Sequence, residues 1–424
     1  MRHIPPPPLY RSLYERLIEL MPNEVDSRLT NLVYVMMGIF LSKSVQTGRM
    51  ASKVPIASKR LSIVRRLERF LANPSVRVRE WYAPVARHWL LAAASSGQVR
   101  LIIDGTKVSF HHQLLMVAVC YKGRALPIAW TWLGHSRGHS GQYQQLALLE
   151  YVRQLVPAKA NVCLVGDTEF GHCLVLENSD HWHWAYVLRQ SGHQLVWTQD
   201  KAGWQALGEI LKVPGEWRWL PNTVLTQASA YPSHLLLYWR QGEKRPWLLA
   251  TKLTDPILIM RTYTRRMWIE ELFGDLKKHG FDLESSHMQS FLHLSRLTLA
   301  VALLYVWLVT EGAQALIQGR STQVDRSNRR DLSLFRIGLE LVEQALCWGD
   351  TFRVEFRPIL THHCSLFFAL IYCRVARKKT AFFDQDRHVL IFDAKTVQQI
   401  NICFRICSAD SHQRDQLVQR TNNL

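Results

Sequence analysis

The stretch Tyr263-Thr-Arg-Arg-Met-Trp-Ile-Glu-Glu-Leu-Phe-Gly-Asp-Leu-Lys277 decides how the rest of the chain is interpreted. We expect it to lie in a helix that begins after Asp255 and the proline next to it, because Asp suits an N-cap and Pro suits the first helical position. Tyr263, Glu270 and Lys277 are spaced seven residues apart. Arg266 falls between the first two, so the four side chains are expected on one helix face. Such a face offers positive charge and donors to a phosphate.

The alternative without a functional role is a solvent-exposed helix face with an ion pair between Arg266 and Glu270. The spacing, however, is that of the YREK signature, with no gap or substitution. On these residues the chain resembles DDE transposases of the bacterial insertion-sequence-four family. The resemblance covers roughly residues 25–350 and is densest at 101–105, 164–171 and 247–287.

Length and charge limit the class of protein. A chain of 424 residues is too long for one ordinary core, so two or three domains are expected. Lys and Arg number 52 against 34 Asp and Glu, a formal charge of +18. This surplus favours a polyanionic partner, with nucleic acid ahead of an anionic membrane surface. A generically basic soluble protein is the alternative.

No targeting or cysteine framework is visible. The N-terminus lacks an apolar signal segment, and the apolar runs 32–41 and 297–309 are too short for a membrane span. The eight cysteines show no paired CxxC spacing, and Cys403 and Cys407 are interpreted as free thiols. We therefore expect a cytoplasmic, nucleoid-associated protein without a membrane partner.

Residues 1–95 are predicted to be helical and basic. Helical periodicity runs through Leu29–Leu41 and Leu61–Leu71, and the second segment carries Arg65, Arg66 and Arg69. Two short helices with a basic second member are compatible with a helix-turn-helix-like DNA contact. Many ordinary helical pairs share this pattern, so both interpretations stay open.

From Val99 the hydrophobic period changes from helix to strand. The expected elements are strands Val99–Ile103, Leu114–Tyr121 and Leu126–Trp132, a helix at Gln142–Leu155, and strands Val162–Val165 and Trp184–Leu188. Three strands in meander order, a helix and then a strand predict a ribonuclease-H-like α/β core. Asp104 and Asp167 would then lie on adjacent strands, and the helix bearing Glu270 would close the same pocket.

Three carboxylates from distant parts of the chain form a minimal ligand set for Mg²⁺, which prefers oxygen ligands. Each acid alone is weak evidence, because Asp-Gly after a strand is usually a turn. The competing carboxylates are Glu169, Asp275 and Glu271. Glu271 lies one residue off the YREK stripe, which favours Glu270.

The interval 190–255 is too long for a simple connection inside such a core. It contains alternating stretches at Ser233–Trp239 and Pro246–Thr251 and is rich in Trp. It resembles the β-rich insertion domain of the family. Trp247 resembles the family residue that stacks on a flipped base, a role in which an aromatic ring offsets the cost of flipping. Core packing is the alternative for any single Trp.

The family resemblance implies a mechanism and site residues. Asp104, Asp167 and Glu270 would be catalytic and hold two Mg²⁺ ions, with Mn²⁺ as a substitute. The enzyme would nick one strand at the element's end, form a DNA hairpin on that end, and join the reopened end to target DNA. The residues implied to contact DNA are Tyr263, Arg266, Lys277, Trp247 and Arg189. The implied partners are terminal inverted repeats and target DNA, bound by a homodimer in the synaptic complex.

The predicted fold is thus a ribonuclease-H-like α/β core interrupted by a β-rich insertion domain, with a helical N-terminal domain and a mainly helical C-terminal region. The predicted boundaries are 1–95 for the basic DNA-binding domain, 96–189 and 256–318 for the two parts of the core, 190–255 for the insertion, and 319–424 for the C-terminal region. Helices are expected at 290–318 and 332–348. The role of residues 351–424 stays open, and His287 and His293 are expected in core or capping roles. A nuclease-only enzyme and a non-catalytic DNA-binding protein of the same fold are the alternatives.

Overall fold

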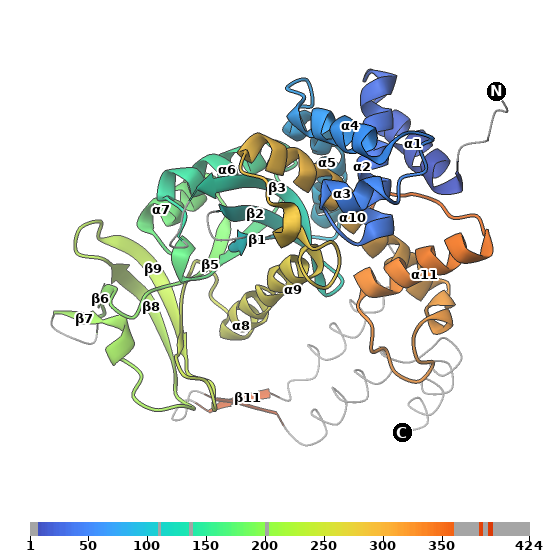
Figure 1. The fold of residues 1–424 in the computed structure, drawn as a ribbon. Helices are drawn as coiled ribbons and strands as arrows, with labels where there is room; N and C mark the ends of the chain where they lie inside the picture. Colours follow the sequence, from blue (N-terminus) through green and yellow to red (C-terminus); the bar gives the residue numbers. More distant parts are fainter. Residues whose placement is uncertain are drawn as a thin grey trace, which may run out of the picture. The chain divides into compact units, whose positions relative to one another are not determined.

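The computed structural model describes residues 7–108, 112–134, 139–199, 203–359, 381–384 and 389–392. The chain divides into two compact units, Met1–Ile359 and Leu360–Leu424. In the second unit the strands β11 (Ala381–Asp384) and β12 (Val389–Phe392) form an antiparallel pair. Cys403 and Cys407 and most of the predicted region 351–424 lie outside the described residues. The first unit contains the helices α1 to α11 and the strands β1 to β10 (Figure 1).

The first unit is a mixed α/β structure in which a helical N-terminal part precedes one large sheet. Its α-helices are α1 Pro8–Leu20, α2 Asp26–Ser42, α3 Thr47–Ala51, α4 Arg60–Ala72, α5 Val78–Ser95, α6 Gln142–Leu155, α7 Cys173–His181, α8 Pro256–Thr264, α9 Met267–Leu276, α10 Phe291–Ile317 and α11 Leu334–Trp348. Its strands are β1 Val99–Val108, β2 His112–Tyr121, β3 Arg124–Gly134, β4 Val162–Gly166, β5 Ala185–Arg189, β6 Leu195–Trp197, β7 Trp204–Ala206, β8 Trp217–Leu225, β9 Tyr231–Tyr238 and β10 Trp247–Thr251. Every strand and helix expected from the sequence between 99 and 189 is present, although β1 runs five residues beyond its expected end at Ile103.

All ten strands belong to one sheet in the order β3-β2-β1-β4-β5-β10-β9-β8-β6-β7. The hairpin β2–β3 turns at Lys122 and Gly123, whose positive φ values of 43° and 85° suit a tight primed turn. β1, β4 and β5 run parallel, and β10 pairs antiparallel with both β5 and β9. The strands of the interval 190–255 therefore extend the core sheet directly.

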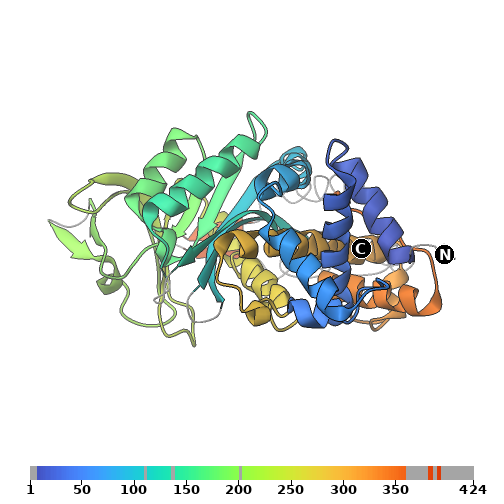
Figure 2. The ribbon, with the colours of Figure 1, turned by 45° about the horizontal axis from the view of Figure 1, so that its top comes forward.

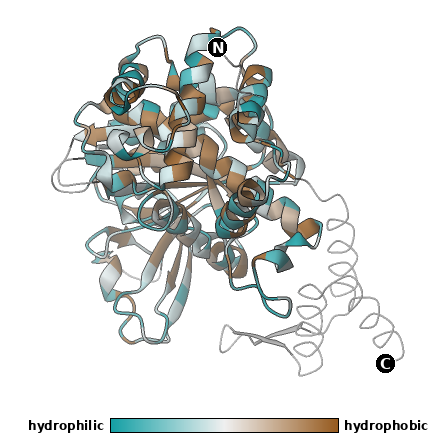
Figure 3. Ribbon diagram, turned by 45° about the vertical axis from the view of Figure 1, so that its right-hand side comes forward, coloured by the Kyte–Doolittle hydropathy of each residue, from teal (hydrophilic) through white to brown (hydrophobic). Residues whose placement is uncertain are grey.

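Helices cover both faces of the sheet, with α6 and α7 on one side and α8 and α9 on the other (Figures 1 and 2). Alternation along β4 explains this arrangement, because successive side chains of a strand point to opposite faces. Cys163 and Val165 pack in a cluster with Ile259 and Tyr263 of α8. Leu164, between them, belongs to the main core together with the apolar residues of α7. Figure 3 shows hydrophobic strands at the centre of the sheet, and β1, β2 and β4 are buried along most of their length, as expected for strands covered on both faces.

Helix α10 is the central helix of the helical part. It spans 27 residues and is long and apolar enough, by length and composition, to cross a membrane; 83% of its most apolar window is buried inside the protein. The helix expected at 290–318 is therefore confirmed, and its burial is that of a core helix. The buried Arg296 of α10 donates to the carbonyls of Leu71 (2.8 Å) and Val76 (3.2 Å), which ties the end of α4 to α10.

Candidate active site

Asp104 lies inside the central strand β1, opposite Met116 of β2. Its residue is 8% exposed, and its Oδ1 accepts a hydrogen bond from the Gly105 backbone N–H at 2.7 Å. Burial, with the nearby Asp167 carboxylate as the next cause, raises the pKa of Asp104 to about 7. The positive charge near Asp104 is therefore too small to stabilise its carboxylate form fully.

Asp167 follows β4 directly. In the parallel register Ile103 is opposite Gly166, so the next residue of each strand is an aspartate. Asp167 Oδ1 accepts the Glu169 backbone N–H at 2.9 Å, and burial raises the pKa of Asp167 as well. A Cβ on Gly166 would come within 3.1 Å of Ile103, so glycine lets the neighbouring strands pack closely just before the two acids.

The YREK stretch forms two helices instead of the single helix expected from its sequence. Asp255 caps α8 as predicted, its side chain accepting from the Ile257 backbone N–H at 2.8 Å. The helix ends at Thr264, and α9 begins at Met267. Between them the N–H of Arg266 bonds to the carbonyl three residues back at 2.9 Å, which tightens the turn relative to an α-helix. This step separates Tyr263 from the rest of the signature.

The second helix carries Arg266 and Glu270 to the two aspartates. Arg266 Nη1 lies 3.1 Å from Asp104 Oδ2, and Arg266 Nη2 lies 2.5 Å from Glu270 Oε1. Asp104, Asp167, Arg266, Glu270 and Lys277 line one cavity of about 400 Å³, called here the acid cavity. Burial lowers the pKa of Arg266, but Tyr263, Asp104 and Glu270 together raise it by more, so the guanidinium stays charged.

Lys277 lies just after α9 and not on the helical stripe expected for it. Its backbone (φ −94°, ψ −124°) leaves the helix, so the side chain turns toward the end of β1. There Nζ donates to the Lys107 carbonyl and forms an ion pair with Glu284 at 3.1 Å. Lys277 therefore reaches the acid cavity from its rim.

The other three predicted DNA contacts form a separate cluster beside Asp167. Tyr263 is 3% exposed and its ring meets that of Trp247 edge to face at 4.9 Å between centroids. Arg189 Nη2 donates to the Pro246 carbonyl at 2.8 Å, and its charge acts to lower the pKa of both Asp167 and Tyr263, in each case by less than burial raises it. Trp247 is half-buried. None of these three residues lines the acid cavity.

The competing carboxylates have other partners. Glu169 accepts the Ser140 backbone N–H at 2.6 Å and the Ser140 hydroxyl. Arg124 of β3 lies 3.2 Å from Glu271 and 3.3 Å from Asp275. Of the acids on α9, Glu270 is the one that lines the acid cavity.

The donor chemistry of the acid cavity fits Mg²⁺. Asp104, Asp167 and Glu270 offer carboxylate oxygens, the hard ligands that this ion prefers. The raised pKa of Asp104 marks a place where a cation would be stabilised. Within the ranges that the structure describes, no three His, Cys, Asp or Glu side chains stand close enough to hold an ion as they are arranged. Arg266 bridges two of the three acids instead.

Two contributions to this site were missed at the level of sequence. Ser140 donates its backbone N–H to Glu169, which lies two residues after Asp167. The only signal for Ser140 in the sequence was its place just before Gly141, the N-cap of α6. Gly171 lets the loop after Asp167 lie against β5, since a Cβ there would come within 2.3 Å of the Arg189 carbonyl oxygen. His293, expected in a core or capping role, donates its backbone N–H to the Ser290 hydroxyl at 3.5 Å.

Residues 95–307, about half of the chain, match the family described as "Transposase DDE domain". The chain belongs to the DDE transposase family. As a transposase it acts on DNA, and DDE domains generally use divalent metal ions. No curated protein matches the transposase. Among solved structures it is similar to a piggyBac transposase synaptic complex with hairpin DNA, at 8% identity and a TM-score of 0.37, covering 92% of this chain and 86% of that chain. The assignment rests on the family match alone.

Proposed function

We propose that this transposase belongs to a bacterial insertion sequence of the insertion-sequence-four type, built on a ribonuclease-H-like core. The order of β1, β2, β3, α6 and β4, with β4 parallel to β1, supports that core. The observation that carries the proposal is the acid cavity, which is lined by Asp104, Asp167 and Glu270. The two aspartates come directly after Ile103 and Gly166, which are paired between β1 and β4. Arg266 lies between Asp104 and Glu270. The domain boundaries and the homodimer stay predictions.

The three acids would hold two Mg²⁺ ions, or Mn²⁺ in their place. Two such ions supply activation of the attacking oxygen and stabilisation of the leaving oxygen in an in-line displacement at phosphorus. Before binding, Arg266 balances part of the negative charge of Asp104 and Glu270. Deprotonation of Asp104 completes the ligand set, because a carboxyl must lose its proton to act as an anionic ligand.

The basic members of the signature would position the substrate. Arg266 and Lys277 line the acid cavity and offer charge-assisted hydrogen bonds to the scissile phosphate. Tyr263 would act through packing, since its ring supports Trp247. The half-buried face of Trp247 would stack on a flipped base, and Arg189 would hold the adjoining backbone. Such a platform is needed for a hairpin pathway and not for simple nicking.

The test is cleavage of labelled linear DNA that carries the element's own end, with Mg²⁺ present. Wild type is expected to give a nick, then a hairpin on the released end, then strand transfer to a target plasmid. Glu270→Gln should bind DNA and not nick it, whereas Glu271→Gln, one residue away, should keep most of the activity. Equal cleavage by Glu270→Gln and wild type would refute the site.

The same assay separates the alternatives. A nuclease-only enzyme would nick without hairpin or transfer product, and a non-catalytic DNA-binding protein would bind without nicking. Hairpin formation followed by strand transfer is the outcome expected here.

A further inference from the structure

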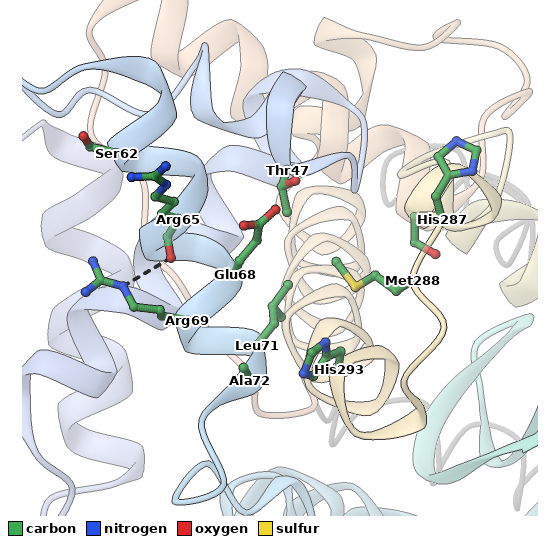
Figure 4. A pocket seen from close by; sticks show the side chains of 11 residues that line it. Thr47, Ser62, Arg65, Glu68, Arg69, Leu71, Ala72, His287, Met288 and His293 are labelled. Atoms are coloured by element: carbon green, nitrogen blue, oxygen red, sulfur yellow. Dashed lines mark hydrogen bonds between the residues drawn. The ribbon is translucent and has the colours of Figure 1, made fainter.

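A second cavity of about 890 Å³ lies between α4 and the connection from Leu283–Ser286 to α10; it is called here the α4 trough. In Figure 4 the side chains of Arg65 and Arg69 lie on one side of Glu68, and those of His287 and His293 on the other. The trough is separate from the acid cavity and shares no lining residue with it.

The two arginines of the trough are exposed and free of acidic partners. Among the described residues, neither the Arg65 nor the Arg69 guanidinium forms an ion pair with a carboxylate. Arg69 Nε donates to the Arg65 carbonyl at 3.3 Å. Their neighbour Arg66 is used differently, since it bonds the Asn31 side chain at 2.6 Å and covers the Tyr34 ring. Two arginines one helical turn apart thus remain available to a ligand.

The remaining lining suits a sugar–phosphate backbone. Leu71 and Met288 supply apolar surface between the ends of the trough, and Thr47 and Ser62 supply hydroxyls. Phosphates are contacted in proteins mainly by Arg, Lys, Ser and Thr side chains. We propose that the α4 trough holds the phosphate backbone of duplex DNA beside the cleavage position, with Arg65 and Arg69 as the phosphate contacts.

The walls of the trough are held in place independently of any ligand. Arg296 of α10 bonds the Leu71 carbonyl at the end of α4, at 2.8 Å. The Ser44 and Ser285 hydroxyls lie 3.5 Å apart, joining the corner between α2 and α3 to the segment that forms the opposite wall. A preformed surface of this kind binds a rigid duplex with little ordering cost.

The trough is also within a short reach of the acid cavity. Lys277 lines the acid cavity and pairs with Glu284, and Ser286 lines the trough. Glu284, the partner of Lys277, lies two residues before Ser286 in the chain. The same short segment therefore joins the acid cavity to the trough.

This proposal rests on the proposed function only for the position of the DNA, so binding and cleavage are measured separately. The probes are a linear duplex that carries the element's end and a random-sequence duplex of equal length. Both are titrated at several salt concentrations against the full chain in a Glu270→Gln background, which isolates binding. Arg65→Gln/Arg69→Gln should weaken both duplexes by at least about tenfold at low salt and reduce the salt slope by about one unit per arginine.

Three control proteins share the measurement. Arg153→Gln/Arg336→Gln removes two exposed helix arginines that already pair with Glu150 and Glu340, and should leave the slope unchanged. Arg65→Lys/Arg69→Lys keeps the charge and should restore most of the slope. Glu68→Gln removes the carboxylate from the trough and should tighten binding, a gain that a merely structural role would not produce.

Phosphate-ethylation interference then maps the contact. Loss of interference in the Arg65→Gln/Arg69→Gln protein, confined to one group of phosphates beside the cut, is the expected result. An unchanged slope and footprint in that protein, while the background protein binds and wild type cleaves, would overturn the trough and leave the proposed function standing. If the Arg65→Gln/Arg69→Gln protein shows the reduced slope but wild type never cleaves, the trough stands and the proposed function is overturned. Weaker binding to phosphatidylglycerol vesicles with unchanged duplex binding would also overturn it.

Discussion

Arg266 Nη1 lies 3.1 Å from Asp104 Oδ2, which joins the turn between α8 and α9 to the central strand across 162 residues. Helix α9 buries its apolar face, which includes Ile269 and Leu272, and Arg266 at its start also pairs with Glu270. Arg266 also gives Asp104 a positive neighbour, which acts to lower the pKa of Asp104 against the larger effect of burial. The electrostatic balance of the site can therefore be changed by one side chain at a time.

The pH dependence of cleavage should follow Asp104. Its pKa is raised to about 7, so the carboxyl is largely protonated below that pH and cannot act as an anionic ligand. Nicking rates at fixed, subsaturating Mg²⁺ should rise as the pH increases through 7 and then level off. Raising the Mg²⁺ concentration should move this rise to lower pH, because metal and proton compete. A profile that is flat across neutral pH would contradict the assignment.

Folding stability should show the opposite sign. A carboxyl whose pKa is higher in the folded than in the unfolded chain destabilises the fold as the pH rises from about 4 through 7. With a chelator present, Asp104→Asn should thus be more stable than wild type at pH 8, by at most about 4 kcal/mol. The difference should shrink near pH 4. Thermal unfolding at both pH values is the measurement, and Asp255→Asn, an exposed helix cap, is the control.

Removal of Arg266 should shift the acid limb of the activity profile. Arg266→Gln loses a charge that lowers the pKa of Asp104, so the rise in nicking rate should move to higher pH. The neighbouring Arg265→Gln removes the same charge without a contact to either acid. An equal shift in both variants would mean that net charge, and not the Asp104 contact, sets the profile.

Trp247 should matter for the hairpin more than for the nick. Trp247→Ala removes a ring that packs at 4.9 Å on Tyr263 and would remove the proposed stacking platform. We expect nicking to continue while hairpin yield falls, with Trp247→Phe retaining most of it. Trp219→Ala, a half-buried ring of the same sheet that contacts His234 at 5.6 Å, is the matched control. Gel analysis under denaturing conditions separates the two products.

Arg124 should anchor α9 through Asp275. Burial raises the pKa of Asp275 to about 7, and Arg124 acts to lower it. Arg124→Met should destabilise the fold by roughly 1–3 kcal/mol, and more above pH 7 than below, because the unpaired buried carboxyl must then lose its proton. Adding Asp275→Asn should remove this pH dependence. Chemical unfolding at pH 6 and pH 8 tests it, and an identical loss at both would show that Asp275 is not involved.

Local patterns in the sequence were enough for most individual elements. Strand alternation from Val99 and helical periodicity at 142–155 depend on neighbours along the chain, so the predicted bounds agree closely with β4, with α6 and with the start of β1. The N-cap at Asp255 is likewise local, because the cap and the N–H it accepts are two residues apart.

The step between α8 and α9 was not predictable in the same way. The sequence from Tyr263 to Lys277 is compatible with one helix, and nothing in its composition requires an end at Thr264. The end is favoured by contacts of the two helices with different strands, which a periodicity argument does not contain. The same holds for Lys277, whose partners Lys107 and Glu284 come from other segments.

The sequence by itself determined the spacing of Tyr263, Arg266, Glu270 and Lys277, the order of the core elements and the choice of three candidate acids, because each of these depends on residue identity and position along the chain. Tertiary structure alone decided that Ile103 pairs with Gly166, that Arg266 bridges Asp104 and Glu270, and that Tyr263 is buried against Trp247. Strand register and side-chain burial are set by packing between segments far apart in the chain. The free energy of that packing depends on both segments together, so the local pattern of either one does not predict it.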